Sequence, residues 1–327
     1  MSLRLDESWL WDFWLARDGS DFHLFFLKAP RSIEDPEQRH WNVSIGHAVS
    51  TDLTRWEMLP DALAPAAEPA WDDYTTWTGS IIRSNGQWWM FYTGTSRSED
   101  GKVQRIGAAL SDDLVTWRRH RANPLIESDP RWYEQYEPAS WPELAWRDPW
   151  IFEDDAGTFH TLVTARAASG PPATRGVIGH AVSTDLSSWT VTEPITTPGR
   201  FGHLEIPQVE HIDGRWQLIF SAPPAPQDVQ RELPDTATAG THLLTAPKPL
   251  GPYEWSTHRL LDSTDGESTF YGGRLVEDGS GWQLLTWASH DGDGSFVGAL
   301  DDPQPVRITP DGLEVRRGGR AHRSSST

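Results

Sequence analysis

The chain has 327 residues, a length that fits one large all-β domain or two ordinary domains. Its 47 acidic and 28 basic residues give a formal charge of −19, which repels phosphate backbones and excludes a nucleic-acid partner. The chain has no cysteine, which excludes disulfides and thiolate metal sites, and it lacks the run of about 18 apolar residues that a membrane span needs.

A segment of one pattern recurs along the chain. IGHAVSTDLTRW begins at Ile45, IGAALSDDLVTW at Ile106 and IGHAVSTDLSSW at Ile178. Weaker copies begin at Gly240 and Val297. Self-similarity at a fixed period of about 60 residues is the signature of a repeat architecture such as a β-propeller. We interpret the aspartates of the repeated Asp-Leu pairs as turn caps and the tryptophans that end the segments as packing between repeats.

Each repeat also contains alternating segments that predict β-strands. Apolar and polar residues alternate after a turn at 21–29, 86–94, 157–165, 214–222 and 281–289, and a further strand-like motif precedes each of these. The sequence therefore predicts an all-β, single-domain, five-bladed β-propeller over residues 1–317, with blades starting near residues 9, 77, 146, 203 and 270. A β-helix or a sandwich is the alternative. Residues 318–327 are basic and serine-rich, and we predict a disordered tail.

The first strand of each blade lines the central channel of a propeller, so equivalent positions on these strands converge. Here those positions hold Asp12, Ser80, Asp148, Glu205 and Tyr271. Three carboxyl groups on one channel wall repel one another and raise the pKa of at least one of them. One protonated and one ionised acid are what glycosidic bond cleavage requires. The alternatives are a structural cation held by the three acids, or simple solvation at the channel mouth.

Several of these motifs resemble a known group of enzymes. WTGS at 77–80 and WRDP at 146–149 resemble motifs of glycoside hydrolase clan J, families 32 and 68, which contain invertases, other β-fructofuranosidases and levansucrases. The stretch 40–60 and the Glu-Ile-Pro that begins at Glu205 resemble family 32, and WDFW at 11–14 resembles family 68. The resemblance covers residues 8–300. Ile206 stands where family 32 has cysteine, and the first-blade motif of that family is absent.

The resemblance implies a retaining glycoside hydrolase or fructosyltransferase that acts on β-fructofuranosides such as sucrose or short fructo-oligosaccharides. It implies that Asp12 is the nucleophile, Asp148 the transition-state stabiliser and Glu205 the general acid/base, with no metal and no cofactor. We expect further substrate contacts from residues on or beside the first strands, namely Trp11, Trp14, Trp77, Ser80, Arg147, His203 and Tyr271.

Two other functions remain open at this stage. An inverting arabinofuranosidase or xylosidase of the family 43 type shares the propeller and three carboxylates, although Arg147 before Asp148 favours the fructoside families. A non-catalytic carbohydrate-binding propeller would need only aromatic walls. The N-terminus lacks a secretion-signal pattern, which predicts a cytoplasmic protein with a small carbohydrate as its partner and no membrane association. The sequence assigns no oligomeric state.

Overall fold

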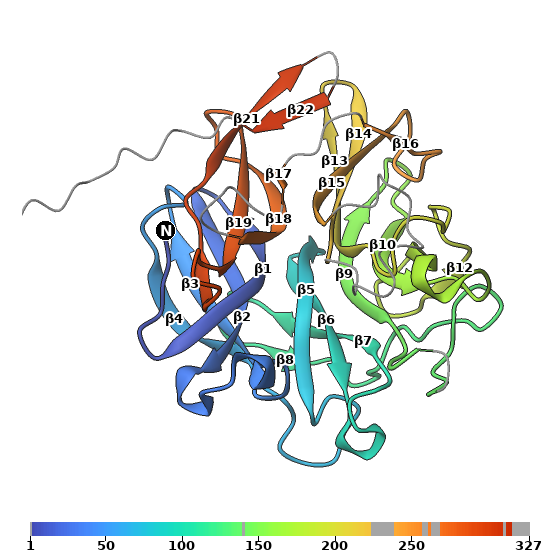
Figure 1. The fold of residues 1–327 in the computed structure, drawn as a ribbon, viewed down its shortest axis with the longest axis horizontal. Coiled ribbons are helices and arrows are strands. Elements are labelled where there is room, and N and C mark those ends of the chain that lie inside the picture. Colours follow the sequence, from blue (N-terminus) through green and yellow to red (C-terminus); the bar gives the residue numbers. More distant parts are fainter. Residues whose placement is uncertain are drawn as a thin grey trace, which may run out of the picture.

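The computed structural model describes residues 2–138, 141–223, 239–256, 261–262, 269–309 and 312–315. Five antiparallel sheets are arranged around a common axis, with the first strand of each sheet nearest that axis (Figure 1). The predicted all-β, five-bladed propeller is confirmed. The predicted tail at 318–327 lies outside the described residues. No helix in the described part of the chain is long and apolar enough to cross a membrane.

Every blade is built by consecutive strands of the chain. Blade 1 contains β1 (Ser8–Asp18), β2 (Asp21–Pro30), β3 (Ser44–Ser50) and β4 (Glu57–Leu63). Blade 2 contains β5 (Thr75–Ser84), β6 (Gln87–Thr95), β7 (Arg105–Ser111) and β8 (Arg118–Arg119). Blade 3 contains β9 (Trp146–Glu153), β10 (Phe159–Arg166), β11 (Gly176–Ser183) and β12 (Thr190–Thr192).

The last two blades each have one additional strand. Blade 4 contains β13 (Glu205–Ile212), β14 (Arg215–Ala222), β15 (Gly240–Ala246) and β16 (Glu254–Trp255), with β17 (Leu261–Asp262) paired to β15. Blade 5 contains β18 (Thr269–Glu277), β19 (Trp282–His290), β21 (Gln304–Thr309) and β22 (Gly312–Val315), with β20 (Phe296–Leu300) paired to β19. Short 3-10 turns occupy Arg31–Ile33, Pro36–Trp41, Arg97–Glu99 and Pro172–Thr174.

The repeated Asp-Leu pair forms a capped turn after the third strand of a blade. The Asp52 carboxylate accepts the backbone N–H groups of Thr54 at 2.9 Å and Arg55 at 2.8 Å. Leu53 is buried with φ 61°, a left-handed conformation that is rare for a leucine and is sustained here by packing on both sides. Asp113 and Asp185 cap the equivalent turns of blades 2 and 3 in the same way.

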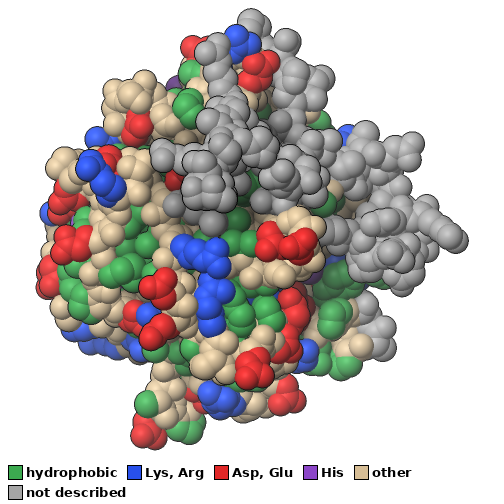
Figure 2. All heavy atoms as spheres, turned by 60° about the vertical axis from the view of Figure 1, so that its left-hand side comes forward, with side chains coloured by type: hydrophobic (Ala, Val, Ile, Leu, Met, Phe, Trp, Pro, Cys, Tyr) green, Lys and Arg blue, Asp and Glu red, His purple; other side chains and the backbone are tan. Residues whose placement is uncertain are grey.

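The tryptophans that follow these turns pack one blade against the previous one. Trp117 of blade 2 meets Phe25 of blade 1 edge-on at 5.7 Å, and Trp189 of blade 3 meets Phe91 of blade 2 at 5.5 Å. The ring of blades is closed by the N-terminus, because the N–H of Leu300 in β20 donates to the carbonyl of Leu3 at 2.9 Å. Acidic and basic side chains are interspersed over the described part of the face shown in Figure 2. The packed interfaces fix how far each first strand stands from the axis.

Candidate active site

A β-bulge interrupts the first strand of every blade at the same level. The pairing register shifts between Trp11 and Phe13, between Trp77 and Gly79, and at the corresponding places in β9, β13 and β18. Four of the five bulges contain a residue with positive φ, and these are Asp12 at 22°, Asp148 at 57°, Ile206 at 55° and Gly272 at 66°. A bulge re-aims side chains, which explains why aspartate and proline occur inside these strands.

The bulges correct the sequence-based alignment of the first strands. In blades 1 and 3 the positive-φ residue is the acid itself, Asp12 or Asp148. In blade 4 the positive-φ residue is Ile206, and Glu205 precedes it by one residue. In blade 2 the bulged residue is Thr78, and its hydroxyl donates to Oδ2 of Asp12 at 3.4 Å. Ser80, predicted as a substrate contact, is therefore not the residue beside Asp12 in this blade. It is buried and accepts the N–H of Ile151 at 3.0 Å, so it joins blades 2 and 3.

The three predicted acids line a single cavity of about 370 Å³. Asp12, Asp148 and Glu205 all line it, despite lying on three different blades. The remaining walls come from first strands, from β2, from the 3-10 turn Pro36–Trp41 and from loops. They consist of Trp11, Leu27, Glu37, His40, Trp41, Trp77, Thr78, Gln104, Glu143 and Arg147. Carboxyl groups, amide and guanidinium donors, and indole rings in one hollow are the components of a carbohydrate site.

Asp12 lies in a low-dielectric environment among other acids. Trp287 Nε1 donates to its Oδ1 at 3.0 Å. Burial raises the pKa of Asp12 to about 7, with further increases from the charges of Asp148 and Glu205, while the hydrogen bond from Trp287 acts in the opposite direction. Asp12 therefore exchanges a proton near neutral pH, unlike an ordinary surface aspartate.

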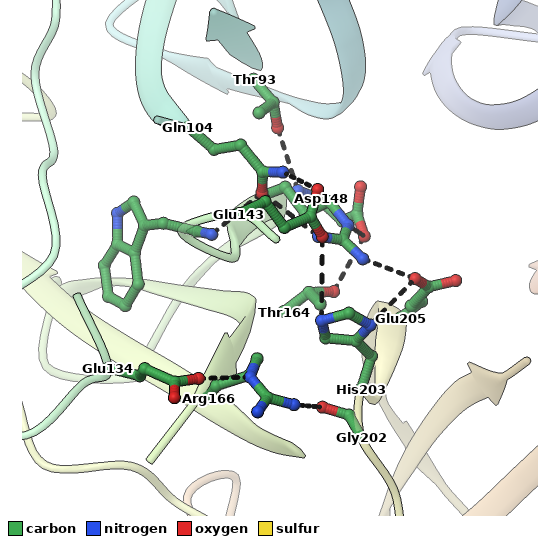
Figure 3. Close-up of polar contacts among 12 residues, drawn as sticks. Thr93, Gln104, Glu134, Glu143, Asp148, Thr164, Arg166, Gly202, His203 and Glu205 are labelled. Carbon is green, nitrogen blue, oxygen red and sulfur yellow. Dashed lines mark hydrogen bonds and ion pairs between the residues drawn. The ribbon is translucent and has the colours of Figure 1, made fainter. Parts of the chain in front are cut away.

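Asp148 is held rigidly by donors from two neighbouring strands. Its Oδ2 accepts the Thr164 hydroxyl at 2.8 Å and the N–H of Ile206 at 3.2 Å. Its own N–H donates to Thr93 Oγ1 at 3.0 Å, as Figure 3 shows. Burial raises the pKa of Asp148, and the adjacent Arg147 guanidinium partly opposes this. Such a fixed carboxyl group suits binding and charge stabilisation more than movement toward a reacting atom.

A guanidinium joins the third acid to a loop residue. Arg147 donates from Nη2 to Glu205 Oε1 at 2.5 Å and from Nη1 to Glu143 Oε1 at 2.8 Å. Gln104 completes the network, since its Nε2 donates to Glu143 Oε2 at 2.9 Å and its Oε1 accepts from Arg147 Nη1 at 3.2 Å. Figure 3 shows Gln104, Glu143 and Glu205 converging at this point. The neighbouring carboxylates raise the pKa of Arg147, so its charge is permanent.

Two predicted substrate contacts, Tyr271 and His203, lie next to Glu205 but do not line the cavity. The Tyr271 hydroxyl donates to Glu205 Oε2. His203 Nδ1 lies 3.8 Å from Glu205 Oε1, and its Nε2 lies 3.8 Å from Glu143 (Figure 3). Burial and the nearby Arg147 and Arg166 charges hold the pKa of His203 well below its usual range, so the imidazole is neutral. Tyr271 thus orients Glu205 through a hydrogen bond, whereas the neutral His203 packs beside Glu205 beyond hydrogen-bond distance.

The three predicted tryptophans differ in their surroundings. Trp11 and Trp77 line the cavity, and Trp77 Nε1 donates to the His40 carbonyl at 2.9 Å. Trp14, the third predicted substrate contact, is not among the residues that line the cavity. Trp14 pairs with Phe25 two rungs further along β1 than Trp11, where it is fully buried and stacks on the Phe25 ring at 6.2 Å. It belongs to the core between blades.

Sequence reasoning missed the residues that loops supply. Gln104, Glu143 and the 3-10 turn residues His40 and Trp41 line the cavity although none is on a first strand. Burial lowers the pKa of His40 to about 3, so it contributes a neutral ring. Glu143 stands four residues before Arg147 but in a loop, where that spacing does not predict a contact, so the sequence carried no signal for this pair. Among the described residues, no group of three or more His, Cys, Asp or Glu side chains is arranged to hold a metal ion.

The sequence matches the family described as the glycosyl hydrolases family 32 N-terminal domain over residues 15–290. The chain belongs to this family. The matched segment of this family 32 chain contains Asp148 and Glu205 and begins just after Asp12. Curated relatives include sucrose-6-phosphate hydrolase of Bacillus subtilis, 26% identical over 61% of this chain and 38% of that protein. Beta-fructofuranosidase 1 of Zea mays is 34% identical over 33% of this chain and 16% of that protein. The family 32 chain thus spans well under half the length of these relatives.

Solved structures of three groups share the fold. A family 32 beta-fructofuranosidase of Bombyx mori has a TM-score of 0.69 at 18% identity, covering 97% of this chain and 64% of that one. Levansucrase of Bacillus subtilis has a TM-score of 0.71 at 15% identity, covering 95% and 87%. A thermostable family 43 glycoside hydrolase has a TM-score of 0.72 at 17% identity, covering 97% and 95%. The propeller by itself does not separate these groups, whereas the family 32 sequence match does.

Proposed function

We propose that the protein is a retaining glycoside hydrolase that removes a terminal β-fructofuranosyl unit from a small fructoside, such as sucrose or a short fructo-oligosaccharide. The observation that carries this proposal is the meeting of Asp12, Asp148 and Glu205 in one cavity of a family 32 chain. The names of its relatives from Bacillus subtilis, Zea mays and Bombyx mori all refer to the hydrolysis of such bonds.

The proposed reaction has two steps. Glu205 donates a proton to the leaving oxygen while the Asp12 carboxylate attacks the anomeric carbon, breaking the glycosidic bond and forming a fructosyl-enzyme ester. Asp148 accepts hydrogen bonds from ring hydroxyls and stabilises the positive charge that develops on the ring. Glu205 then takes a proton from water as the water attacks the anomeric carbon and releases Asp12. A second sugar in place of water would give transfer, as the name of the similar 6(G)-fructosyltransferase of Asparagus officinalis indicates for that protein.

The polar wall of the cavity supports recognition of a hydroxyl-rich ring. Thr78, Gln104 and Arg147 offer donors, and Glu143 and Asp148 offer acceptors. Trp11 and Trp77 provide apolar ring faces against which the carbon skeleton of a sugar can pack. We assign these residues to substrate orientation, because a fixed near-attack geometry supplies a large part of the rate enhancement of an enzyme.

A substrate screen with product analysis tests the proposal. Sucrose, sucrose 6-phosphate, short inulin- and levan-type oligosaccharides, and aryl arabinosides and xylosides would be offered in parallel. We expect fructose release, with the first-formed anomer in proton NMR having the configuration of the substrate. Activity on pentosides alone, or an inverted first product, would transfer the protein to the family 43-like alternative. Binding without turnover of any glycoside would assign it to a carbohydrate-binding role.

A further inference from the structure

Among the described residues the fifth blade contributes no acid to the cavity, yet its first strand touches Glu205 and the bulges that follow Asp12 and Glu205. In β18, Tyr271 donates to Glu205, and Gly272 lies against the Trp287 indole that holds Asp12. A Cβ at Gly272 would stand 2.7 Å from Trp287 Nε1, so a larger residue would displace that hydrogen bond. The next charged residue of the strand, Arg274, has no role in the mechanism described above.

Arg274 is a buried arginine that holds two active-site bulges at once. Its side chain is 1% exposed. Its Nε donates at 3.2 Å to the carbonyl of Phe13, the residue after Asp12. Its Nη1 donates to the carbonyls of Ile206 at 3.2 Å and Pro207 at 2.8 Å, directly after Glu205. One guanidinium therefore spans blades 1, 4 and 5 at the level where the strands bulge.

The residue whose carbonyl accepts from Arg274 also positions Asp148, through its own N–H group. The carbonyl of Ile206 accepts from Arg274, while the N–H of Ile206 donates to Asp148 Oδ2 at 3.2 Å. Ile206 has φ 55°, a conformation that an isoleucine adopts only under external constraint. The hydrogen bonds from Arg274 supply part of that constraint, so the arrangement of two acids depends on a residue that touches neither of them through its side chain.

Arg274 also brings a positive charge close to the acids. It lines a second cavity of about 280 Å³ with Glu210 and Trp150, separate from the cavity that contains the acids. Burial lowers the pKa of Arg274 to about 10, and the charges of Asp148, Asp12 and Glu210 act in the opposite direction. Charge interactions are mutual, so the guanidinium also favours the ionised forms of Asp12 and Asp148, although Arg39 acts more strongly on Asp12 and Arg147 on Asp148.

We propose that Arg274 is a positioning residue of the active site, which fixes the bulges that carry Asp12 and Glu205. This inference rests on the proposed function for the roles of those acids. Arg274 acts through backbone carbonyls and through its electric field, and it does not contact substrate. Its loss should therefore lower kcat and move the pH profile, while KM changes little.

The experiment compares R274Q and R274K with wild type and with R17Q as matched control. Arg17 lines the same second cavity but is exposed at its rim, so R17Q removes a positive charge without touching a bulge. We expect R274Q to lower kcat about ten- to a hundredfold, with KM within about threefold, and to move the acid limb of kcat/KM to higher pH. R274K retains the charge but not the forked donor geometry, so it should lower kcat with an acid limb close to wild type.

A titration of carboxyl carbon NMR signals gives a readout that needs no turnover, with D12N identifying the Asp12 signal. R274Q should raise the pKa of Asp12, whereas R17Q should not. If the wild-type protein acts on no fructoside, the proposed function is refuted. The titration then still tests whether Arg274 influences Asp12. The inference about Arg274 would be overturned if R274Q left kcat, the acid limb and the pKa of Asp12 unchanged. It would also be overturned if a lower Tm were the only effect of R274Q. If R274Q does not fold, a wild-type kcat in R274K overturns it.

Discussion

Arg147 Nη2 lies 2.5 Å from Oε1 of Glu205, although 58 residues separate the two in the chain. The same guanidinium donates to Glu143 at 2.8 Å, so one permanent cation is shared between a first-strand acid and a loop acid. This pairing sets the orientation of Glu205 together with the Tyr271 hydroxyl. It also places a fork of donors at the edge of the cavity, where sugar hydroxyls would bind.

Replacing Arg147 should separate these roles. R147K keeps a positive charge, but an ammonium group does not reproduce two divergent hydrogen bonds. We expect kcat/KM to fall about a hundredfold, equivalent to about 3 kcal/mol of transition-state stabilisation. E143Q removes one partner of the guanidinium and preserves shape, so it should reduce kcat/KM by only about tenfold. Steady-state kinetics on the preferred fructoside checks both values, and an R147K enzyme as active as wild type would remove Arg147 from the site.

Neutralising the proposed nucleophile or the proposed acid/base should abolish turnover without unfolding the protein. D12N and E205Q each remove a chemical role and keep the volume of the side chain. We expect kcat to fall by at least about a thousandfold in each, with a circular dichroism spectrum like that of wild type. Thr164→Ser, which keeps the hydroxyl that donates to Asp148, is the control for a conservative change in the site. Turnover near the wild-type level in either acid variant would refute its assigned role.

The pH dependence should reflect the unusual titration of Asp12. Its pKa is about 7, and Asp12 attacks only as a carboxylate, so the acid limb of kcat/KM should lie near neutrality rather than near pH 4. The charges of Asp148 and Glu205 contribute to this elevation. E205Q should therefore lower the pKa of Asp12, observable by carboxyl carbon NMR in the inactive variant. An acid limb below about pH 5 in wild type would contradict the burial argument.

The same pKa shift predicts that the active site reduces stability. Folding raises the pKa of Asp12 from 3.8 to about 7, so the folded protein binds the proton more tightly and loses stability as pH rises from about 4 to 7. D12N removes this loss, and the Thr78 hydroxyl can accept a hydrogen bond from the new amide. Asp12 is partly accessible, so at pH 8 we expect a gain of about 2 kcal/mol, below the about 4 kcal/mol of three full pKa units. Denaturant unfolding at pH 4 and pH 8 measures the gain, which should vanish at pH 4.

Substitution of Trp14 should mainly reduce stability, whereas substitution of Trp77 should mainly weaken substrate binding. Trp14 is fully buried against Phe25, so W14A should lower the free energy of unfolding by about 3–5 kcal/mol. Trp77 lines the cavity, so W77A should raise KM about tenfold through loss of a sugar-packing face, with a smaller loss of stability. Chemical denaturation and steady-state kinetics on both variants separate the effects. A larger KM change in W14A than in W77A would contradict the placement of the two rings.

The sequence alone determined the architecture and the three acids. A recurring segment of about 60 residues with alternating strands implies blades, because each blade buries its faces only against a neighbouring one. The geometry of a propeller then brings the first strands together whatever their separation in sequence. Asp12, Asp148 and Glu205 could be found this way because their relation is set by the repeat, and the position of each on its own strand was enough.

Tertiary structure decided the details that depend on the bulges, on the loops and on how deeply each side chain is buried. The bulges changed the equivalence of positions, so Thr78 replaced Ser80 beside Asp12. Trp14 lies two rungs from Trp11 along β1, and only the packing of the blades decides which ring reaches the cavity. Glu143 approaches through a loop, and Arg274 acts through carbonyls of two other blades. A periodic pattern specifies which residues share a strand face, whereas contacts between loops and blades arise from the closed ring as a whole.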